Sequence, residues 1–390
     1  MEPGPKFVYN DSLSTPSKGF MQAEVFDVVI VGAGVIGHSI AYKLKRSDPG
    51  LKIAVLGDPM NSLMASRAAA GMLAPFCECQ KGDQFFRFCR ESLEKYPAFV
   101  QELSTLSGVP IHLSTAGSVM PAKSVGDQWQ ARLEFFHQEN IRHEIWSVEK
   151  VREKLPDFAD DCGEVIWVAE GQVNNRQLHD ALVAASSKLG IRIFPSNATG
   201  FRHDPSSIQA VVTDAGLVAG SKFVLAAGSW SLPLGEGLGL SLPLKPIKGQ
   251  MCRVQVAEGR LDYTIHGIMT YVAPWGEGNG LILGSTMEDT GFNPVVEEDV
   301  IQGLIDRAAE ILPFLKEAPL VESWTGLRPA AEDLMPIMGA STRYENLFYS
   351  TGHYRNGILQ TPNQADYLAG AILGGLRESI PEFDPARYDL

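Results

Sequence analysis

The pattern of apolar and polar positions is most informative near the N-terminus, where an apolar run leads directly into closely spaced glycines. Residues 28–31 (VVIV) form a continuous apolar run, which is typical of a parallel strand buried on both faces. Gly32, Gly34 and Gly37 follow, and residues 39–45 then carry their apolar side chains on one side of a helix. The sequence therefore predicts a strand, a tight turn and a helix, in that order.

This order gives each glycine a physical task. Gly32 permits the tight turn, Gly34 lets backbone amides approach a pyrophosphate, and Gly37 lets the helix pack closely on the strand. A phosphate at this turn would lie at the positive end of the helix dipole. We therefore expect a dinucleotide site here, and the alternative is a glycine-rich turn that binds nothing.

The second predicted strand, residues 52–56, departs from the usual dinucleotide pattern. A carboxylate that holds the ribose hydroxyls is expected about twenty residues after the glycines, but the chain has Gly57 there and Asp58 next. Either Asp58 reaches the ribose from the loop, or backbone groups and water replace the contact. The residues around this point include no arginine to pair with a 2′-phosphate, so NADP is not expected.

Residues 65–75 (ASRAAAGMLAP) have mostly very small side chains. Such a run, with Gly71 inside it, lets the backbone lie flat against a large planar group such as a flavin. A nicotinamide enzyme has no need of it, so the segment favours FAD over NAD. The alternative is a small-residue helix that packs closely on a sheet.

The rest of the chain alternates between helical and strand patterns. Residues 80–161 carry aromatic and charged side chains at helical spacing, which indicates amphipathic helices covering a sheet. Residues 173–189 form a predicted helix capped near Asn174, and residues 221–230 a buried strand that ends in small residues. Three further strands, which predict a mixed or antiparallel sheet, cover residues 249–256, 270–274 and 280–284.

Composition narrows the class of protein. The 390 residues carry a net charge of −13, which argues against nucleic-acid binding and against a polybasic membrane anchor. The sequence contains no apolar stretch long enough to span a membrane. Residues 1–25 lack the apolar centre of a secretory signal, and we interpret them as a flexible N-terminal extension.

The five cysteines are too few, and odd in number, for a disulfide framework. A reducing, cytoplasmic location is therefore expected. Cys77 and Cys79 form a C-x-C pair that could suggest a metal site, but no second Cys or His pair stands beside them at ligand spacing. We expect ordinary cysteines and no metal.

Four sequence blocks together resemble one family. They are GAGVIG at residues 32–37, ASRAAAGMLAP at 65–75, WTGLRP at 324–329 and GHYRNGILQTP at 352–362. Over residues 26–376 the chain resembles the glycine oxidase branch of the FAD-dependent amine and amino-acid oxidases, which are relatives of D-amino-acid oxidase and sarcosine oxidase.

The resemblance implies an α/β fold of the D-amino-acid oxidase type with two domains. A discontinuous Rossmann-like FAD-binding domain, marked by GxGxxG, would comprise residues 26–80, 165–230 and 325–385. A substrate-binding α+β domain with a mixed or antiparallel sheet would comprise residues 81–164 and 231–324. Relatives of this kind also suggest a homo-oligomer.

The resemblance also places FAD. Cofactor-binding positions carried over from it are Gly32, Gly34, Val35, Ile36, Gly37, Asp58, Ser66, Arg67, Ala69, Ala70, Gly71, Met72, Val173, Ala227, Gly228, Arg355, Asn356, Gly357 and Ile358. Sarcosine oxidase relatives often bind FAD covalently through a cysteine near the C-terminus, but no cysteine follows Cys252. We therefore expect non-covalent FAD.

Five side chains match the family's substrate pocket. Arg328 corresponds to the arginine that binds the substrate carboxylate, which suits its planar fork of donors, and Tyr271 to the tyrosine that shares this carboxylate. Arg355 corresponds to a second arginine near the flavin, and Met72 and Met287 to pocket-lining methionines. Without the resemblance, Arg328 could be a surface charge, and Tyr271 and the methionines ordinary core residues.

Two further features concern the flavin and the acid–base chemistry. Thr361 and Pro362 are typical of a helix start, so we expect a helix from there to Leu376 with its positive end facing the pyrimidine side of the flavin. Glycine oxidase has a histidine two residues before the pocket tyrosine, where this chain has Met269. A base role at that position is therefore in doubt.

The activity that the resemblance implies is the oxidative deamination of glycine, sarcosine or a small D-amino acid, with hydride transfer to FAD and reoxidation by molecular oxygen. The imine would be hydrolysed, or would feed the thiazole ring in thiamine synthesis. One alternative is a D-amino-acid or secondary-amine dehydrogenase that passes electrons to another carrier. An alternative of a different class is a non-catalytic flavin-binding subunit of a complex.

Overall fold

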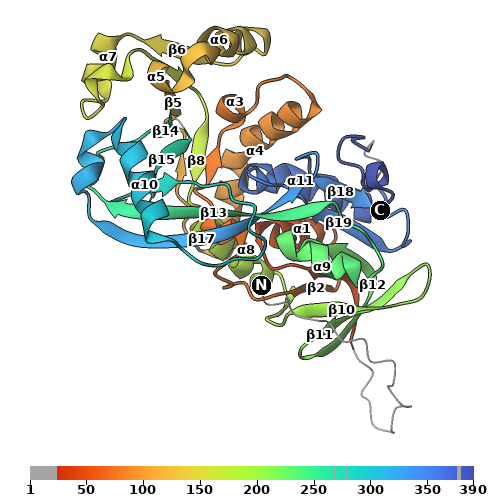
Figure 1. Ribbon diagram of the computed structural model, residues 1–390. Coiled ribbons are helices and arrows are strands. Elements are labelled where there is room, and N and C mark those ends of the chain that lie inside the picture. The colour runs from red at the N-terminus through yellow and green to blue at the C-terminus, as the bar shows by residue number, and fades with distance from the viewer. Residues whose placement is uncertain (1–23, 268, 277–278, 376–378) are drawn as a thin grey trace.

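The computed structural model describes residues 24–267, 269–276, 279–375 and 379–390. The predicted N-terminal extension lies outside the described residues, except for its last two positions. The described part contains two eight-stranded sheets and one three-stranded sheet (Figure 1). None of its helices is long and apolar enough to cross a membrane.

The first sheet has the strand order β10-β11-β12-β1-β2-β9, with β19 also beside β12 and β18 beside β19. Strand β1 pairs in parallel with both β12 and β2, β9 with β2, and β19 with β12. The predicted Rossmann-like arrangement is therefore present. Its strands are β1 Val25–Val31, β2 Ile53–Leu56, β9 Arg192–Phe194, β10 Ala198–His203, β11 Ile208–Thr213, β12 Gly216–Leu225, β18 Ile337–Ala340 and β19 Leu347–Thr351.

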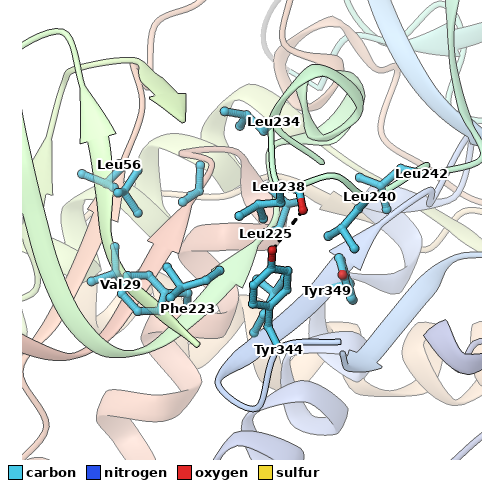
Figure 2. Close-up of a cluster of buried hydrophobic side chains, with 14 of the residues drawn as sticks. Val29, Leu56, Phe223, Leu225, Leu234, Leu238, Leu240, Leu242, Tyr344 and Tyr349 are labelled. Atoms are coloured by element: carbon cyan, nitrogen blue, oxygen red, sulfur yellow. Dashed lines mark hydrogen bonds between the residues drawn. The ribbon is translucent and has the colours of Figure 1, made fainter. Parts of the chain in front are cut away.

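Strand β1 is buried on both faces, which explains its unbroken apolar run. Ile30 packs with Ile40 and Leu368, on the face covered by helices α1 and α11. Val29 packs on the opposite face with Phe223 and with the leucines that follow β12, as Figure 2 shows. In that cluster the hydroxyl of Tyr344 donates to the carbonyl of Leu238 at 3.0 Å, so its buried polar atom is satisfied.

Helices α1, α4, α8 and α11 pack against one another beside the first sheet. Asn174 caps α8 by accepting hydrogen bonds from the backbone N–H groups of Arg176 and Gln177, which confirms the predicted cap. The helices of this region are α1 Val35–Ser47, α2 Ala65–Ala68, α3 Pro75–Glu78, α4 Gln84–Ser107, α8 Asn175–Lys188, α9 Ser231–Glu236 and α11 Gly357–Ile372.

The second sheet has the order β17-β13-β16-β15-β14-β5-β7-β6 and is antiparallel except where β14 meets β5. This confirms the predicted mixed sheet, and its long strands β13 and β17 extend across the middle of the molecule (Figure 1). Its strands are β5 Ser118–Pro121, β6 His143–Trp146, β7 Val165–Val168, β13 Leu244–Gln255, β14 Thr264–Gly267, β15 Thr270–Pro274, β16 Gly280–Gly284 and β17 Leu320–Ala331.

Smaller elements connect and cover these sheets. The three-stranded sheet consists of β3 Met72–Leu73, β4 Leu113–Ser114 and β8 Gly171–Val173. The remaining α-helices are α5 Ala122–Val125, α6 Trp129–Gln138, α7 Val148–Lys154 and α10 Glu298–Ala309. The short 3₁₀ helices are η1 Gly126–Gln128, η2 Asp160–Cys162, η3 Gly228–Trp230, η4 Pro313–Glu317 and η5 Pro385–Tyr388.

Two strands lie in a different sheet from the one that the predicted domain boundaries imply. Residues 165 and 325 were placed at boundaries of the FAD-binding domain, but β7 pairs with β5 and β6, and β17 pairs with β13 along most of its length. An apolar strand pattern indicates burial and does not identify the partner strand. The domain boundaries at these two residues stay predictions.

The start predicted for the C-terminal helix is also wrong. Helix α11 begins at Gly357 rather than at Thr361, and Thr361 and Pro362 lie inside it. Pro362 has no N–H to donate to the carbonyl of Ile358, and the hydroxyl of Tyr96 donates to that carbonyl instead. Tertiary contact therefore lets the helix tolerate a proline that normally marks a helix start.

Candidate functional site

A cavity of about 1150 Å³ is lined by residues of both large sheets. It begins at the β1–α1 turn and the end of β2, passes the segment from α2 to β3, and reaches β15, β16 and β17. The first residues of α11 line it as well. Segments distant in the sequence therefore form one elongated site.

The glycines of the first turn open one end of this cavity. Gly32 has a φ of +126°, and a Cβ there would lie 2.2 Å from the carbonyl oxygen of Ala226, so a larger residue would not fit. Gly34 is the N-cap of α1, which directs the positive end of the helix to the cavity. A Cβ on Gly37 would lie 1.9 Å from the carbonyl oxygen of Gly32, so Gly37 allows the close packing of helix on strand.

The small-residue segment forms one wall. Gly71 has a φ of +78°, and a Cβ there would lie 1.8 Å from the carbonyl oxygen of Val173. Ala68 occupies the space that a Cβ on Gly326 would need, so this wall packs closely on β17. The hydroxyl of Ser66 accepts from the backbone N–H of Val35 at 3.1 Å and joins the wall to the start of α1.

Arg328 projects from β17 into the cavity, across Gly249 on the neighbouring strand β13. A Cβ on Gly249 would lie 2.3 Å from the Nη1 atom of Arg328, so only glycine leaves room for the guanidinium. Nη1 donates to the carbonyl of Thr286 at 3.1 Å, and Nη2 to the hydroxyl of Ser285 at 2.6 Å. Burial lowers the pKa of Arg328, but arginine stays charged in proteins.

Tyr271 stands opposite Gly284 in the pairing of β15 with β16. A Cβ on Gly284 would lie 2.5 Å from the tyrosine hydroxyl, so the glycine gives the phenol its space. Burial raises the pKa of Tyr271 to about 12, although Arg328 and Ser285 act in the opposite direction. The hydroxyl is therefore protonated near neutral pH and can donate a hydrogen bond.

Arg355 and the start of α11 line a third side of the cavity. The Nη2 atom of Arg355 lies 3.5 Å from the Oε2 atom of Glu78. Burial raises the pKa of Glu78, and the charges of Arg355 and Arg328 partly offset this. Asn356 is the N-cap of α11, so backbone N–H groups and a positive helix end face the cavity here.

Comparison with known proteins identifies the class of protein that has this site. A family model described as FAD dependent oxidoreductase matches residues 27–371. The chain belongs to this family. Its cavity is therefore expected to hold FAD.

Individual family members are similar over most of the chain. The bifunctional protein ThiO/ThiG of Trichormus variabilis is 34% identical over 355 residues, which cover 89% of this chain and 52% of that protein. The glycine oxidase of Geobacillus kaustophilus is 30% identical over 371 residues, or 94% and 96% of the two chains. The crystal structure of a glycine oxidase from Geobacillus kaustophilus matches with a TM-score of 0.86 at 28% identity, covering 94% of this chain and 98% of that one. The chain spans about half the length of the bifunctional relatives.

The residues present fit an FAD molecule. Gly32 and Gly34 line the cavity without side chains, as the close approach of a pyrophosphate requires. The flat small-residue wall ends at the substrate side, where Arg328 and Tyr271 lie. At the opposite end the lining includes Asp58 and Thr199, groups able to hydrogen-bond an adenosine.

The structure brings most of the predicted site residues to this one cavity. Those that line it are Gly32, Gly34, Val35, Ile36, Asp58, Ser66, Ala69, Ala70, Gly71, Met72, Ala227, Gly228, Tyr271, Met287, Arg328, Arg355, Asn356, Gly357 and Ile358. Asp58 is exposed, and its Oδ1 atom accepts from the backbone N–H of Met60 at 2.8 Å. Its contact with a ribose stays a prediction.

Three predicted cofactor residues, Gly37, Arg67 and Val173, lie outside the cavity lining. Gly37 packs against the backbone of Gly32. Arg67 turns away on the single turn of α2, where its Nη1 atom pairs with Asp180 at 2.5 Å. Val173 lies behind the wall, where its backbone N–H donates to the carbonyl of Gly71. The structure instead brings Asn197, Ala198 and Thr199, at the start of β10, to the dinucleotide end.

Several polar residues that line the cavity were not predicted from the sequence, including Glu78, Arg132, His266, Ser285 and Thr286. Glu78 lies between Cys77 and Cys79, and the other segments have no motif, because each contributes only one or two polar residues to a site assembled by the fold. Burial, followed by the charges of Arg132 and Arg355, lowers the pKa of His266 to about 4. This histidine is therefore neutral near pH 7.

One grouping in the described residues has metal-ligand chemistry, namely Cys77, Glu170 and His266, whose ligand atoms lie within 4.8 Å of one another. The Oε2 atom of Glu170 already accepts from the backbone N–H groups of Phe76 and Cys77. Those bonds account for the position of the carboxylate at the start of α3. All five cysteines are free thiols, as expected for a chain without a disulfide framework.

Proposed function

We propose that this chain oxidises glycine or a similar small amine, such as sarcosine or a small D-amino acid, to the imine. The observation that carries the proposal is the placement of Arg328. Its guanidinium faces the cavity beside the small-residue wall, and the bonds that hold it run to the neutral acceptors Thr286 and Ser285. Its positive charge is therefore available to a substrate carboxylate.

The protein's own residues orient the substrate. The fork of Arg328 binds both carboxylate oxygens, and the protonated hydroxyl of Tyr271 donates to one of them. Met72 and Met287 wall the remaining space. With the carboxylate fixed, the Cα–H bond is aligned toward the small-residue wall, and such positioning supplies much of the rate enhancement.

Bound FAD supplies the redox chemistry by accepting a hydride from Cα. Hydrolysis of the imine then gives the 2-oxo acid and ammonia or an amine, and oxygen takes up the electrons as hydrogen peroxide. We propose that FAD is not covalently attached, because Cys252 is the last cysteine of the chain and is fully buried. Acid precipitation should therefore release all of the flavin into the supernatant.

We also propose a cellular location and an oligomeric state for the protein. We expect a cytoplasmic homo-oligomer that binds neither nucleic acid nor membrane, with no metal in its mechanism. A role in supplying an imine for the thiazole ring of thiamine is consistent with its similarity to the ThiO/ThiG proteins.

Steady-state oxidation tests the choice of acceptor. Glycine, sarcosine, D-alanine and D-proline are each supplied in air, and oxygen uptake and peroxide release are followed together. We expect at least one of them to give one peroxide for each amine consumed. Turnover that requires an added quinone or carrier would instead establish a dehydrogenase. Bound FAD that no amine reduces would indicate a non-catalytic flavin subunit.

A further inference from the structure

Lys248 is a fully buried lysine on β13, one residue before the glycine over which Arg328 lies. Its side chain has 0% exposure, and its Nζ atom lies 3.1 Å from Glu288 Oε2 and 2.9 Å from Glu297 Oε1. Burial by itself would lower the pKa of Lys248, but the two carboxylates raise it. The ammonium group is therefore charged and paired, as a buried charge requires.

Gln250 ties the same two acidic residues to β13. Its Nε2 atom donates to Glu288 Oε1 at 3.0 Å, and its Oε1 atom accepts from the backbone N–H of Glu297 at 2.7 Å. The backbones of Lys248 and Glu288 exchange two hydrogen bonds, at 2.9 and 3.0 Å. The segment that contains Glu288 and Glu297 is therefore fixed to β13 by both side-chain and backbone bonds.

This segment also holds the guanidinium of Arg328. Thr286 accepts from Arg328 Nη1 through its carbonyl at 3.1 Å, and its own hydroxyl donates to Glu288 Oε1 and accepts from the backbone N–H of Gln250. Thr286 thus links the arginine to the carboxylate that Lys248 neutralises. Among the described residues no carboxylate forms an ion pair with Arg328 within 4 Å.

We propose that Lys248 is a positioning residue that keeps Arg328 available to the substrate carboxylate, an inference that rests on the proposed function. Through Glu288 it holds Thr286, whose carbonyl accepts from the guanidinium, and it neutralises Glu288 and Glu297. Without the lysine, Glu288 would be a negative charge two residues from Thr286. Attraction between Glu288 and the enclosed guanidinium would then compete with the substrate.

The test measures ligand binding to the oxidised holoenzyme. Glycolate, a small carboxylate with no amine to oxidise, is titrated while the perturbation of the flavin spectrum is followed, and KM and kcat for glycine are measured in parallel. We expect Lys248→Met to raise the Kd of glycolate and the KM of glycine about 10- to 100-fold, with kcat within about 3-fold of wild type and unchanged FAD content.

A rescue variant separates charge from folding. The triple variant Lys248→Met, Glu288→Gln, Glu297→Gln removes the competing carboxylates together with the lysine, and should restore the Kd to within about 3-fold of wild type. Lys245→Met is the matched control, because Lys245 lies on the same strand and pairs with Asp289 but is exposed. This control should leave the Kd unchanged.

An unchanged Kd in Lys248→Met, or no restoration in the triple variant, would overturn the proposal. If Lys248→Met does not fold, Thr286→Val breaks the link at its other end and is expected to raise the Kd about 3- to 10-fold, whereas an unchanged value would again overturn it. Wild-type enzyme that binds glycolate but is reduced by no amine would refute the proposed function alone. Enzyme that glycine reduces, but whose Lys248→Met variant binds glycolate normally, would refute this inference alone.

Discussion

At the scale of single residues, the proposed recognition of a substrate carboxylate depends on the planar fork of Arg328. Lysine keeps the positive charge but loses the fork and both fixed bonds, to Thr286 and Ser285. We expect Arg328→Lys to raise the KM for glycine about 10- to 100-fold, with FAD still bound. Steady-state kinetics and the flavin absorbance of the purified variant measure both quantities. Loss of FAD in the variant would instead assign Arg328 to the cofactor.

The buried carboxyl group of Glu170 leads to a separate prediction, about the pH dependence of folding stability. Burial raises the pKa of Glu170 from 4.5 to about 7, although hydrogen bonds from Cys77, Ser118 and Phe76 oppose this. The folded state therefore binds more protons than the unfolded state between these two values, and the carboxyl group lowers stability as the pH rises through them.

Glu170→Gln removes this titration and keeps an oxygen that can accept from the N–H groups of Phe76 and Cys77. The stability of the variant relative to wild type should therefore increase between pH 4.5 and pH 8, by up to about 3 kcal/mol. Urea unfolding at both pH values, with FAD at the same concentration, measures the difference. If the unfolding free energies of the variant and the wild type differed by the same amount at both pH values, the burial argument would be contradicted.

At the scale of secondary-structure elements, helix α11 depends on contacts with α4. Tyr96 and Ser92 of α4 donate to the carbonyls of Ile358 and Leu359, and Pro362 cannot donate to the first of these. Tyr96→Phe should leave a buried carbonyl unsatisfied and cost about 1–3 kcal/mol of unfolding free energy. Chemical denaturation measures this cost, and Tyr42→Phe, on α1, is the control because its hydroxyl lacks such a backbone acceptor. Equal stabilities of the two variants would contradict this account of the helix.

Helices α1 and α11 show where sequence-based prediction succeeds and where it fails. The β1–α1 unit follows from local pattern alone, because its apolar run and glycines are needed by that unit itself. The start of α11 was misplaced because Thr361 and Pro362 look like a cap. The hydroxyl that makes a proline tolerable there comes from Tyr96, which no local pattern around residue 361 could indicate.

At the scale of the whole molecule, the site is assembled from segments that only the fold brings together. Arg328 and Tyr271 were predicted through family resemblance, whereas Arg132 and His266 reach the cavity from segments with no distinctive sequence motif. The dinucleotide end was predicted from the glycines of the first turn. The start of β10 also lines this end, which the sequence did not indicate, because the strand start that lies beside the cavity depends on the order of strands in the sheet.

The net charge of −13 describes the whole chain, whereas the two arginines proposed to attract the substrate line the cavity. Acidic residues outnumber basic ones in the chain, while Arg328 and Arg355 line the cavity with Glu78, whose pKa is raised. Field lines from enclosed charges concentrate in such a cavity. Substrate selection is therefore a local property, and we expect small amines that carry a carboxylate to be preferred over amines without one.

The most direct test of this account is an anaerobic titration of the flavin-containing enzyme with glycine, sarcosine, D-alanine and D-proline, followed by flavin absorbance. We predict full bleaching by at least one of these amines, no bleaching by methylamine, which lacks a carboxylate, and recovery of the absorbance when oxygen is admitted. An enzyme that holds FAD but is bleached by none of the four amino acids would contradict the central claim that Arg328 positions a small amino acid for oxidation.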